Sequence, residues 1–322
     1  MSMKKMAILT SGGDAPGMNA AIYAAVRMAK SNGIKVIGVT KGYSGLIDGR
    51  LAEIRSKEIV GIVSKGGTIL KTARCEEMKT KEGQDKALKV LKAFGIDGLI
   101  VIGGDGSFKG AQILSHMGMP TIGLPGTIDN DLAYTDYSIG FDTATNYVIN
   151  EIAKIRDTMV SHERIGVIEV MGNGCGDIAL AAGVAGEAEY IVVPEVPFDV
   201  DAICDSLVNR HIKGDMTSIL VISEGAGKGE AFANYIRAKT GFDVKAIVLG
   251  YVQRGGDPSS FDRLLAMRMG IKAVELLQEG IGGKVVGMHN NKIIDYDIDP
   301  ALAMKMKFDK NLYDAHMMMN NY

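Results

Sequence analysis

The sequence lacks several features that mark specialised classes of protein. It has no tryptophan and only three cysteines, Cys75, Cys175 and Cys204, whose spacing is unpaired. This cysteine usage argues against a disulfide framework and a zinc site, and it is typical of a reducing compartment. The five histidines show no HExxH spacing either, so a zinc protease is not expected.

The chain also lacks a charge surplus and a long apolar run. Its formal net charge is −2 and its basic residues are scattered, so no nucleic-acid partner is expected. No apolar run approaches the roughly 18 residues of a membrane span, and the start MSMKKMAILTSGGD is too short for a signal-peptide core. We therefore expect a cytoplasmic protein with no membrane partner. Its 322 residues, 47% of them hydrophobic, suit one large or two ordinary globular domains.

The stretch GLPGTIDND at residues 123–131 places a hydroxyl and two carboxylates directly after an apolar, strand-like run. Strand ends are where α/β enzymes keep their catalytic groups. Thr127, Asp129 and Asp131 alternate, so in an extended segment they point to one side, towards one substrate hydroxyl and one metal-bound phosphate. The alternative is an Asx-type turn at residues 129–131 with no further role.

Two glycine-rich loops follow strand-like segments. Residues 6–10 lead into SGGDAPGMN and an alanine-rich helix, and residues 98–102 lead into GGDGSFKG. Glycine leaves room for a phosphate, which backbone N–H groups and a helix N-terminus then bind. Asp105, inside the second loop, is a candidate ligand for the Mg²⁺ that accompanies a polyphosphate. For the first loop, the alternative is a turn that only packs a helix on a sheet.

These loops match neither of two common nucleotide-binding motifs. No GxxxxGK[ST] sequence occurs, at GAGKG near Lys228 or elsewhere. The strand after the first loop ends in Thr40 and Lys41, without the acidic residue that binds a ribose in dinucleotide-binding proteins. A nicotinamide-dependent dehydrogenase is therefore disfavoured.

Two further residues are candidates for binding. Arg74, in KGGTILKTAR, suits the charge that spreads over a transferring phosphoryl group, although a lone arginine is more often a surface residue. Glu224 follows the apolar segment 218–223 and is either a ligand of sugar hydroxyls or a capping carboxylate.

Other segments bear on the architecture. The strand, glycine loop and helix at residues 165–186 loosely repeat those at 6–25, which suggests two similar α/β lobes facing each other across a cleft. We also expect a turn-rich loop at GYSGLIDG and, from Ile293 onward, a peripheral helix and little else.

Taken together, SGGDAPGMNA, GGDGS, PGTIDND, MGNGCGD and LGYVQRGG resemble, in order and spacing, the bacterial ATP-dependent 6-phosphofructokinases. The likeness covers nearly the whole chain. It implies an α/β protein of two similar three-layer α/β/α lobes, with mostly parallel sheets and a cleft between them, usually in a homotetramer. It also implies transfer of the γ-phosphoryl group of MgATP to the 1-hydroxyl of fructose 6-phosphate, the committing step of glycolysis. The ATP-binding lobe would comprise residues 1–140 and about 256–302, and the sugar-phosphate-binding lobe about 141–255 and 303–322.

The resemblance also implies roles for single residues. Asp129 corresponds to the general base, with Thr127 and Asp131 beside it, and Asp105 to the Mg²⁺ ligand. The expected ATP contacts are Gly13, Arg74, Cys75, Gly104, Asp105, Gly106 and Ser107, with Arg74 also catalytic. The expected sugar-phosphate contacts are Thr127, Ile128, Asp129, Met171, Gly172, Asn173, Glu224, Lys245, Tyr251 and Arg254, with Arg164 reaching in from a neighbouring subunit. The expected effector contacts are Arg27, Arg156, Glu189 and Lys213.

Two glycines bear on the phosphoryl donor. Pyrophosphate-dependent relatives typically carry Asp in place of Gly106 and Lys in place of Gly126, so the resemblance favours ATP here. A pyrophosphate-dependent enzyme of the same fold is the nearest alternative. A non-catalytic sugar-binding protein of two α/β lobes is a remoter one, and it would have no use for Asp129.

Several positions depart from the commonest pattern of the family. Asn173 and Lys245 stand where arginine is usual, and Tyr251 stands where histidine is usual. Lysine keeps the charge of arginine but loses its bidentate fork. Basic residues that normally bind the phosphates of the effector are replaced by Tyr23, Ser56 and Asp215. The resemblance therefore predicts weak or absent regulation by ADP and phosphoenolpyruvate.

Overall fold

The computed structural model describes residues 3–306 and 308–320, and the chain forms two compact units. Unit 1 comprises residues up to 128, 132–143 and 254–306, and unit 2 comprises 129–131, 144–253 and the described residues from 308 on. The chain thus passes from one unit to the other within PGTIDND, since Thr127 belongs to unit 1 and Asp129 to unit 2.

Unit 1 contains a seven-stranded sheet in the order β11-β10-β5-β4-β1-β2-β3. The five central strands are parallel, whereas β3 and β11 pair antiparallel at the two edges. The sequence of β4, GLIVIG, is buried throughout, as expected for a parallel strand covered on both faces. The strands are β1 Lys5–Thr10, β2 Lys35–Val39, β3 Leu51–Glu53, β4 Gly98–Gly103, β5 Thr121–Pro125, β10 Lys284–His289 and β11 Lys292–Asp297.

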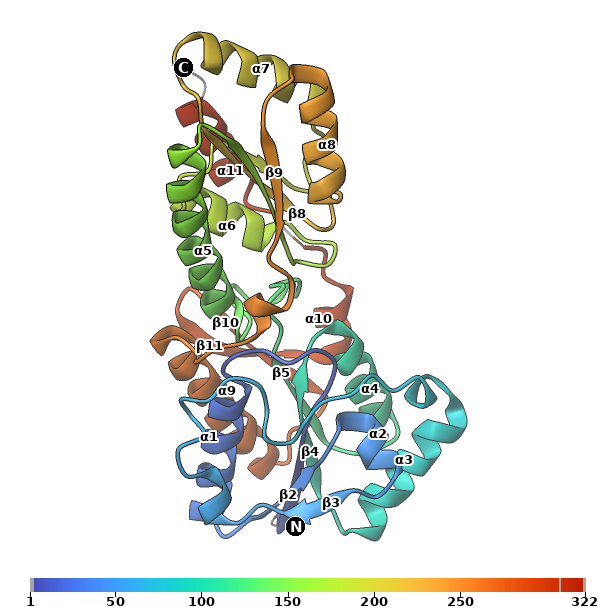
Figure 1. Ribbon diagram of the computed structural model, residues 1–322. Helices are drawn as coiled ribbons and strands as arrows, with labels where there is room; N and C mark the ends of the chain where they lie inside the picture. Colours follow the sequence, from blue (N-terminus) through green and yellow to red (C-terminus); the bar gives the residue numbers. More distant parts are fainter. Residues whose placement is uncertain (1–2, 307, 321–322) are drawn as a thin grey trace. The chain divides into compact units, whose positions relative to one another are not determined.

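Helices cover both faces of this sheet (Figure 1). On one face α1 and α9 pack against each other. On the other face α2, α3 and α4 enclose a buried cluster that includes Leu9, Leu91, Val101 and Phe108. The helices are α1 Met18–Ser31, α2 Gly42–Ile47, α3 Lys81–Ala93, α4 Asp105–His116, α9 Ser260–Gln278 and α10 Ile298–Ala303, with short 3₁₀ turns η1 Ser56–Ile59 and η2 Glu77–Lys79.

Unit 2 contains a four-stranded parallel sheet in the order β7-β8-β6-β9. On one face α7 and α8 enclose a buried cluster with Leu207 and Ile236. On the other face α5 packs Met159 against Gly166, and α6 packs Gly183 against Ile191. The strands are β6 Ile165–Val170, β7 Tyr190–Val192, β8 Ser218–Ser223 and β9 Val244–Val248; the helices are α5 Phe141–Ser161, α6 Asp177–Ala185, α7 Val200–Ile212, α8 Gly229–Thr240 and α11 Lys310–Asn320, with the 3₁₀ turn η3 Gly250–Arg254.

The predicted α/β class with mostly parallel sheets is confirmed, but the expected loop at GYSGLIDG is wrong. This segment forms α2, although glycine opens it. Tyr43 and Leu46 are 3% and 0% exposed, so the helix forms because these side chains enter the core of unit 1. Burial here outweighs the low helix propensity of glycine.

The tail is also richer in structure than expected. β10 and β11 form an antiparallel hairpin around Asn290 and Asn291, whose φ values are 49° and 60°. Two successive residues with positive φ define a type I′ hairpin turn, in which asparagine is favoured. The two asparagines between apolar runs were therefore a readable signal for this hairpin.

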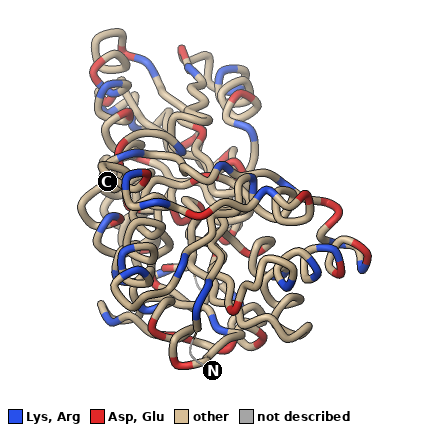
Figure 2. Tube along the Cα trace, turned by 90° about the horizontal axis from the view of Figure 1, so that it is seen from below, with Lys and Arg blue, Asp and Glu red and all other residues tan. Residues whose placement is uncertain are grey.

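Charge is dispersed over both units. Segments with Lys and Arg are interspersed with segments carrying Asp and Glu along the trace (Figure 2). None of the helices within the described residues is both long and apolar enough to cross a membrane.

Candidate active site

The candidate site of unit 1 lies at the carboxyl ends of the adjacent strands β5, β4 and β1. From β1 the chain continues to β2 on one side, whereas β4 lies on the other side of β1. Such a reversal of strand order is the position at which open α/β sheets bind ligands. The loops after the three strands are in contact there, because Ser11 N donates to Ile102 O (2.9 Å) and Gly126 N donates to Gly103 O (2.9 Å).

The loop after β1 brings Gly13 next to Arg254. A Cβ atom on Gly13 would lie 2.5 Å from Nη1 of Arg254, and this guanidinium donates to the backbone oxygen of Asp14 (3.2 Å). Gly12 and Gly17 have φ values of 84° and 104°, which glycine adopts without strain. Glycine thus sets the course of this loop and leaves room for a cationic side chain.

The loop after β4 is shorter than expected, because α4 begins at Asp105. Asp105, Gly106 and Ser107 therefore lie in the first turn of a helix, whose N-terminus favours an anion. The Asp105 side chain is partly exposed and pairs with Lys109 (2.6 Å). Tyr43, whose pKa is raised by burial, donates its hydroxyl to Ser107 O (2.7 Å). The turn is thus fixed from its buried side, and the Asp105 carboxylate remains accessible.

An irregular segment, residues 65–72, leads to the predicted ATP contacts Arg74 and Cys75. Asn19 of α1 fastens it by donating to two of its backbone oxygens (3.0 and 3.2 Å) and accepting from Ile69 N (2.8 Å). Asn19 is 2% exposed, so these hydrogen bonds satisfy a buried amide. The sequence reasoning missed this residue, although it closes the SGGDAPGMN motif.

The central segment begins in a crowded position. A Cβ atom on Gly126 would lie 2.8 Å from Ile102 Cγ2 and 3.0 Å from Met18 Cε. Thr127 follows, with its backbone oxygen bound by Ser138 Oγ (2.7 Å), and a Cβ on Gly104 would lie 3.7 Å from Thr127 Cβ. The GGDGS and PGT motifs are therefore neighbours in unit 1.

The expected alternation of Thr127, Asp129 and Asp131 along an extended segment is wrong. The chain bends at residues 128 and 129, and Asn130 has a left-handed φ of 54°. Asp129 is 8% exposed, and the three carboxylate and amide residues 129–131 all belong to unit 2.

A buried carboxylate supports the loop behind Thr127. Asp262, at the start of α9, accepts hydrogen bonds from Gly140 N (2.9 Å), Thr143 N (2.8 Å) and the Thr143 hydroxyl. Burial raises the pKa of Asp262 to about 6, while these hydrogen bonds act in the opposite direction. Because Ser138 lies in the same loop, Asp262 fixes the backbone that binds Thr127.

The candidate site of unit 2 lies at the carboxyl ends of β8, β6 and β9, which are adjacent. Residues 171–173 follow β6, Glu224 follows β8 and Tyr251 follows β9. Glu224 Oε1 accepts from Asn173 N (3.1 Å), and Asn173 has a left-handed φ of 56°. The structure therefore brings Met171, Gly172, Asn173, Glu224 and Tyr251 to one edge of the sheet.

A second positioning residue at this edge, Gln253, was not predicted. It is 0% exposed; its Oε1 accepts from Met171 N (3.1 Å) and its Nε2 donates to Gly250 O (3.0 Å). Gln253 therefore joins the loop after β6 to the loop after β9. The available signal was an uncharged polar residue inside the VQRGG motif.

Arg164 and Lys245 lie at the opposite edge of the same sheet. Both stand at the amino ends of paired strands, β6 and β9, and both bind Asp243, at 2.6 Å and 2.7 Å. These two cations lower the pKa of Asp243. The six residues of β6 separate these amino ends from the carboxyl ends of the strands, where Glu224 lies, by about 17–20 Å.

The expected effector contacts are distributed over both units. Arg156 pairs with Glu189 (3.0 Å), and Lys213 caps the C-terminus of α7, all in unit 2, whereas Arg27 is exposed on α1 of unit 1. Asp215 pairs with Arg210 (2.7 Å), so its charge is balanced within its own chain.

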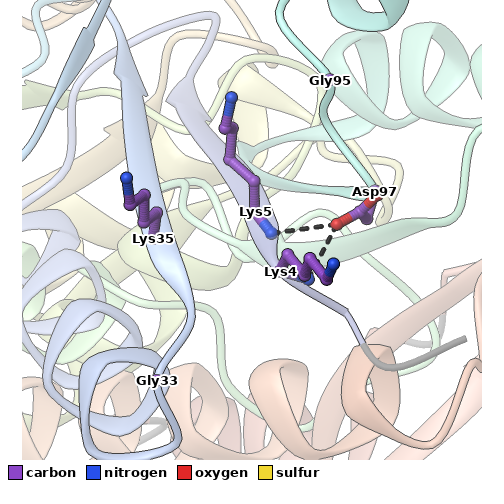
Figure 3. Close-up of a pocket in the computed structure, with 6 residues that line it drawn as sticks. All are labelled: Lys4, Lys5, Gly33, Lys35, Gly95 and Asp97. Carbon is purple, nitrogen blue, oxygen red and sulfur yellow. Dashed lines mark hydrogen bonds between the residues drawn. The ribbon is translucent and has the colours of Figure 1, made fainter.

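A hollow on unit 1 lies away from these loops. It is lined by Lys4, Lys5, Lys35, Asp97 and two glycines, and Asp97 accepts the backbone N–H groups of Lys4 and Lys5 (Figure 3). These residues stand at the amino ends of β1, β2 and β4, opposite the edge that carries the glycine loops.

Glycine loops and a helix N-terminus at a strand-order reversal are typical of α/β proteins that bind phosphate groups. The chain belongs to the phosphofructokinase family, whose model matches residues 5–277.

Named relatives agree with this membership. The chain is 57% identical, over 97% of its length and 98% of the relative's, to an ATP-dependent 6-phosphofructokinase of Clostridium novyi (strain NT), and 56% identical to one of Clostridium botulinum (strain Hall) with the same coverage. It superposes on the phosphofructokinase structure from Saccharomyces cerevisiae with a TM-score of 0.91 and 32% identity, covering 98% of this chain and 50% of the yeast chain. A pyrophosphate-dependent phosphofructokinase from Marinobacter aquaeolei, at 22% identity, 99% and 91% coverage and a TM-score of 0.83, shares the fold.

Gly106 and Gly126 should differ in their tolerance of a methyl group. Gly126→Ala forces Ile102 and Met18 to move, and we expect it to lower the free energy of unfolding by about 1–3 kcal/mol. Gly106→Ala meets nothing within 4 Å and lies in a helix, so its effect should stay within about 1 kcal/mol of zero. Urea unfolding of both variants measures the difference; equal stabilities would contradict the packing described here.

Proposed function

We propose that this chain is an ATP-dependent 6-phosphofructokinase, which converts D-fructose 6-phosphate and ATP to D-fructose 1,6-bisphosphate and ADP in glycolysis. The observation that carries the proposal is the 57% identity to an ATP-dependent 6-phosphofructokinase over almost the full length of both chains. The site geometry agrees, because both units present loops with the residues that phosphoryl transfer requires. Such transfer depends mainly on positioning and charge neutralisation.

In this proposal unit 1 binds ATP. Gly13, Gly104 and the first turn of α4 supply backbone N–H groups to the phosphates, and Arg74 and Cys75 contact the nucleotide. Asp105 fits Mg²⁺, because its accessible carboxylate stands at a helix N-terminus that also favours phosphate oxygens, and Mg²⁺ takes both kinds of oxygen. When bound, the cation neutralises charge on the phosphates. Lys109 would then lose its ion pair with Asp105 and bind solvent or a phosphate oxygen instead.

Unit 2 supplies most contacts with the sugar phosphate in this proposal. Glu224 accepts hydrogen bonds from sugar hydroxyls through the oxygen that does not bind Asn173 N, and residues 171–173 line the sugar. Tyr251, with 84% of its surface exposed, is accessible to a ligand. Three further proposed contacts of the sugar phosphate, Thr127, Ile128 and Arg254, belong to unit 1.

Asp129 is the proposed general base. The 1-hydroxyl oxygen of the sugar attacks the γ-phosphorus, the bond from that phosphorus to the β-phosphate oxygen breaks, and the hydroxyl proton passes to the Asp129 carboxylate. Thr127 and Asp131 flank this residue; Thr127 belongs to the adjacent backbone, and Asp131 supplies a nearby charge. ADP leaves, and the proton is returned to solvent.

The donor proposal rests on Gly106 and Gly126. An aspartate at position 106 would place a carboxylate at the helix N-terminus that receives the phosphates. A lysine at position 126 would displace Ile102 and Met18 from their present places. Both glycines therefore suit a nucleotide in this chain.

Replacing Asp129 tests the proposed base. Asp129→Asn keeps the shape but removes the proton acceptor, so turnover should fall by about 10²–10⁴-fold while ATP binding stays within about twofold. The matched control is Asp205→Asn, an exposed carboxylate on α7. Steady-state kinetics and ATP titration measure both quantities, and near-normal turnover of Asp129→Asn would refute this role.

The position of Arg164 and Lys245 in the sheet of unit 2 supports a proposal of self-association. They are about 17–20 Å of strand away from Glu224 and Tyr251, too far for one sugar phosphate to meet all four residues of one chain. If these cations bind substrate, they do so for another copy. We therefore propose a homo-oligomer, expected to be a tetramer, in which Arg164 and Lys245 complete a neighbour's site.

Mixed oligomers test this arrangement. Asp129→Asn and Arg164→Ala/Lys245→Ala chains, each of low activity at low fructose 6-phosphate, should regain about a quarter of wild-type activity when co-assembled at random. A mixture of Asp129→Asn with Thr127→Ala chains is the control, because both changes lie in one segment and no hybrid site is intact. The absence of recovery in the first mixture would place Arg164 and Lys245 outside the substrate site.

We also propose where the chain acts and which residues contact an effector. The chain acts in the cytoplasm, without nucleic-acid or membrane partners. Arg27, Arg156, Glu189 and Lys213 are the proposed effector contacts. Because Arg156 and Glu189 bind each other, an effector phosphate has to replace that ion pair.

A further inference from the structure

Asn130 separates the two carboxylates Asp129 and Asp131 and has an unusual backbone. Its φ of 54° lies in the left-handed region, which costs most residues about 1 kcal/mol or more and is tolerated best by glycine and asparagine. The direction in which each neighbouring carboxylate leaves the backbone depends on this turn. A group that stabilises the turn therefore influences both carboxylates.

The Asn130 side chain is bound by Asp177. Its amide Nδ2 donates to Asp177 Oδ2 at 3.0 Å; Asn130 is 7% exposed, and the hydrogen bond is partly buried. Both residues belong to unit 2. A charged acceptor strengthens such a hydrogen bond beyond that of a neutral pair.

Asp177 is itself held on a rigid element. It is the first residue of α6, and the preceding Gly176 donates its N–H to Glu195 Oε1 (2.8 Å). A Cβ atom on Gly176 would lie 2.5 Å from Val193 Cγ1 and 2.6 Å from Glu195 Oε2, so the backbone here has little freedom. The acceptor for Asn130 is thus fixed to both α6 and the segment after β7.

The charge of Asp177 also interacts with the segment of residues 129–131. Burial raises the pKa of Asp177, hydrogen bonds from Asn130 and Cys175 lower it, and the carboxylates of Glu195 and Asp131 raise it. These are the charged and titratable groups that act on Asp177 from the packed elements. Ionised Asp177 and ionised Asp131 therefore repel each other.

We propose that Asp177 is a positioning residue for phosphoryl transfer, which holds Asn130 in its left-handed turn and thereby sets the directions of Asp129 and Asp131. The inference rests on the proposed kinase function. Asp177 touches no reacting atom in it. It acts only through the Asn130 amide and through its charge.

A purely structural alternative exists, because a carboxylate in the first turn of a helix stabilises that helix. If Asp177 had only this role, its mutation would lower the stability of the protein without a selective effect on turnover. The test therefore needs variants that separate the hydrogen bond, the charge and the helix.

Three variants make this separation. Asp177→Ala removes the acceptor and the charge, and its kcat should fall about 10–100-fold, with KM for ATP within about twofold, because a small misplacement of reacting groups costs this much. Asn130→Gly keeps the left-handed backbone but removes the amide, and should lower kcat similarly. Asp177→Asn keeps an acceptor oxygen without the charge, so kcat should fall less than about fivefold while the acid limb of the kcat pH profile moves to lower pH.

The double variant Asp177→Ala/Asn130→Gly provides the decisive comparison. If the two residues act as one unit, its kcat should be no lower than that of the worse single variant. Asp201→Ala, a first-turn carboxylate of α7 that binds Tyr235, is the control for a helix effect and should leave kcat unchanged.

The outcomes distinguish the inference from the function on which it rests. A wild-type enzyme without ATP-dependent activity overturns the proposed function. An active wild type with unchanged kcat in Asn130→Gly, or with multiplicative losses in the double variant, overturns the role of Asp177. If Asp177→Ala does not fold, the Asp177→Asn pH profile and the kcat of Asn130→Gly decide, and an unchanged pH profile together with an unchanged kcat counts against the inference.

Discussion

The close approach of backbone at the carboxyl ends of β1 and β4 is the constraint on which the site of unit 1 depends. A Cβ atom on Gly103 would lie 2.6 Å from Ser11 O, so these two strand ends meet only because glycine stands there. Their contact places the SGGD loop beside the N-terminus of α4 at the strand-order reversal. Asn19, Tyr43 and Ser138 then fix the neighbouring segments through hydrogen bonds to backbone groups. Side-chain hydrogen bonds to the backbone thus position loops that have no regular structure of their own.

Unit 2 uses the same kind of support. Gln253 and Glu224 each bind a backbone N–H in residues 171–173, and Asp177 binds the amide of Asn130. A buried polar group that lost its partner here would carry a desolvation cost of about 1–3 kcal/mol, so each loop is held in one arrangement. Rigid loops at a strand edge are suited to reactions that need accurate positioning more than covalent chemistry.

Much of this arrangement was readable from the sequence, and the reasons are physical. Buried parallel strands such as GLIVIG are short apolar runs followed by glycine, so β4 and β8 were predicted with nearly their observed bounds. The first turn of α4 was predicted to be a loop because it contains glycine. The helix nevertheless begins there, since its other residues pack in the core. Local patterns also did not reveal that Arg164 and Lys245 share Asp243 at the amino ends of β6 and β9. The contact between Arg164 and Asp243 joins residues 79 positions apart. Asn130, whose left-handed turn replaces the expected extended segment, shows how one residue redirects its neighbours.

Whether this protein takes the phosphoryl group from ATP or from pyrophosphate decides the proposed function. Initial velocities would be measured with fructose 6-phosphate and Mg²⁺, with either ATP or pyrophosphate as donor. We expect product formation with ATP and none with pyrophosphate. Activity with pyrophosphate alone would show that Gly106 and Gly126 do not select the donor, and activity with neither donor would contradict the proposed function.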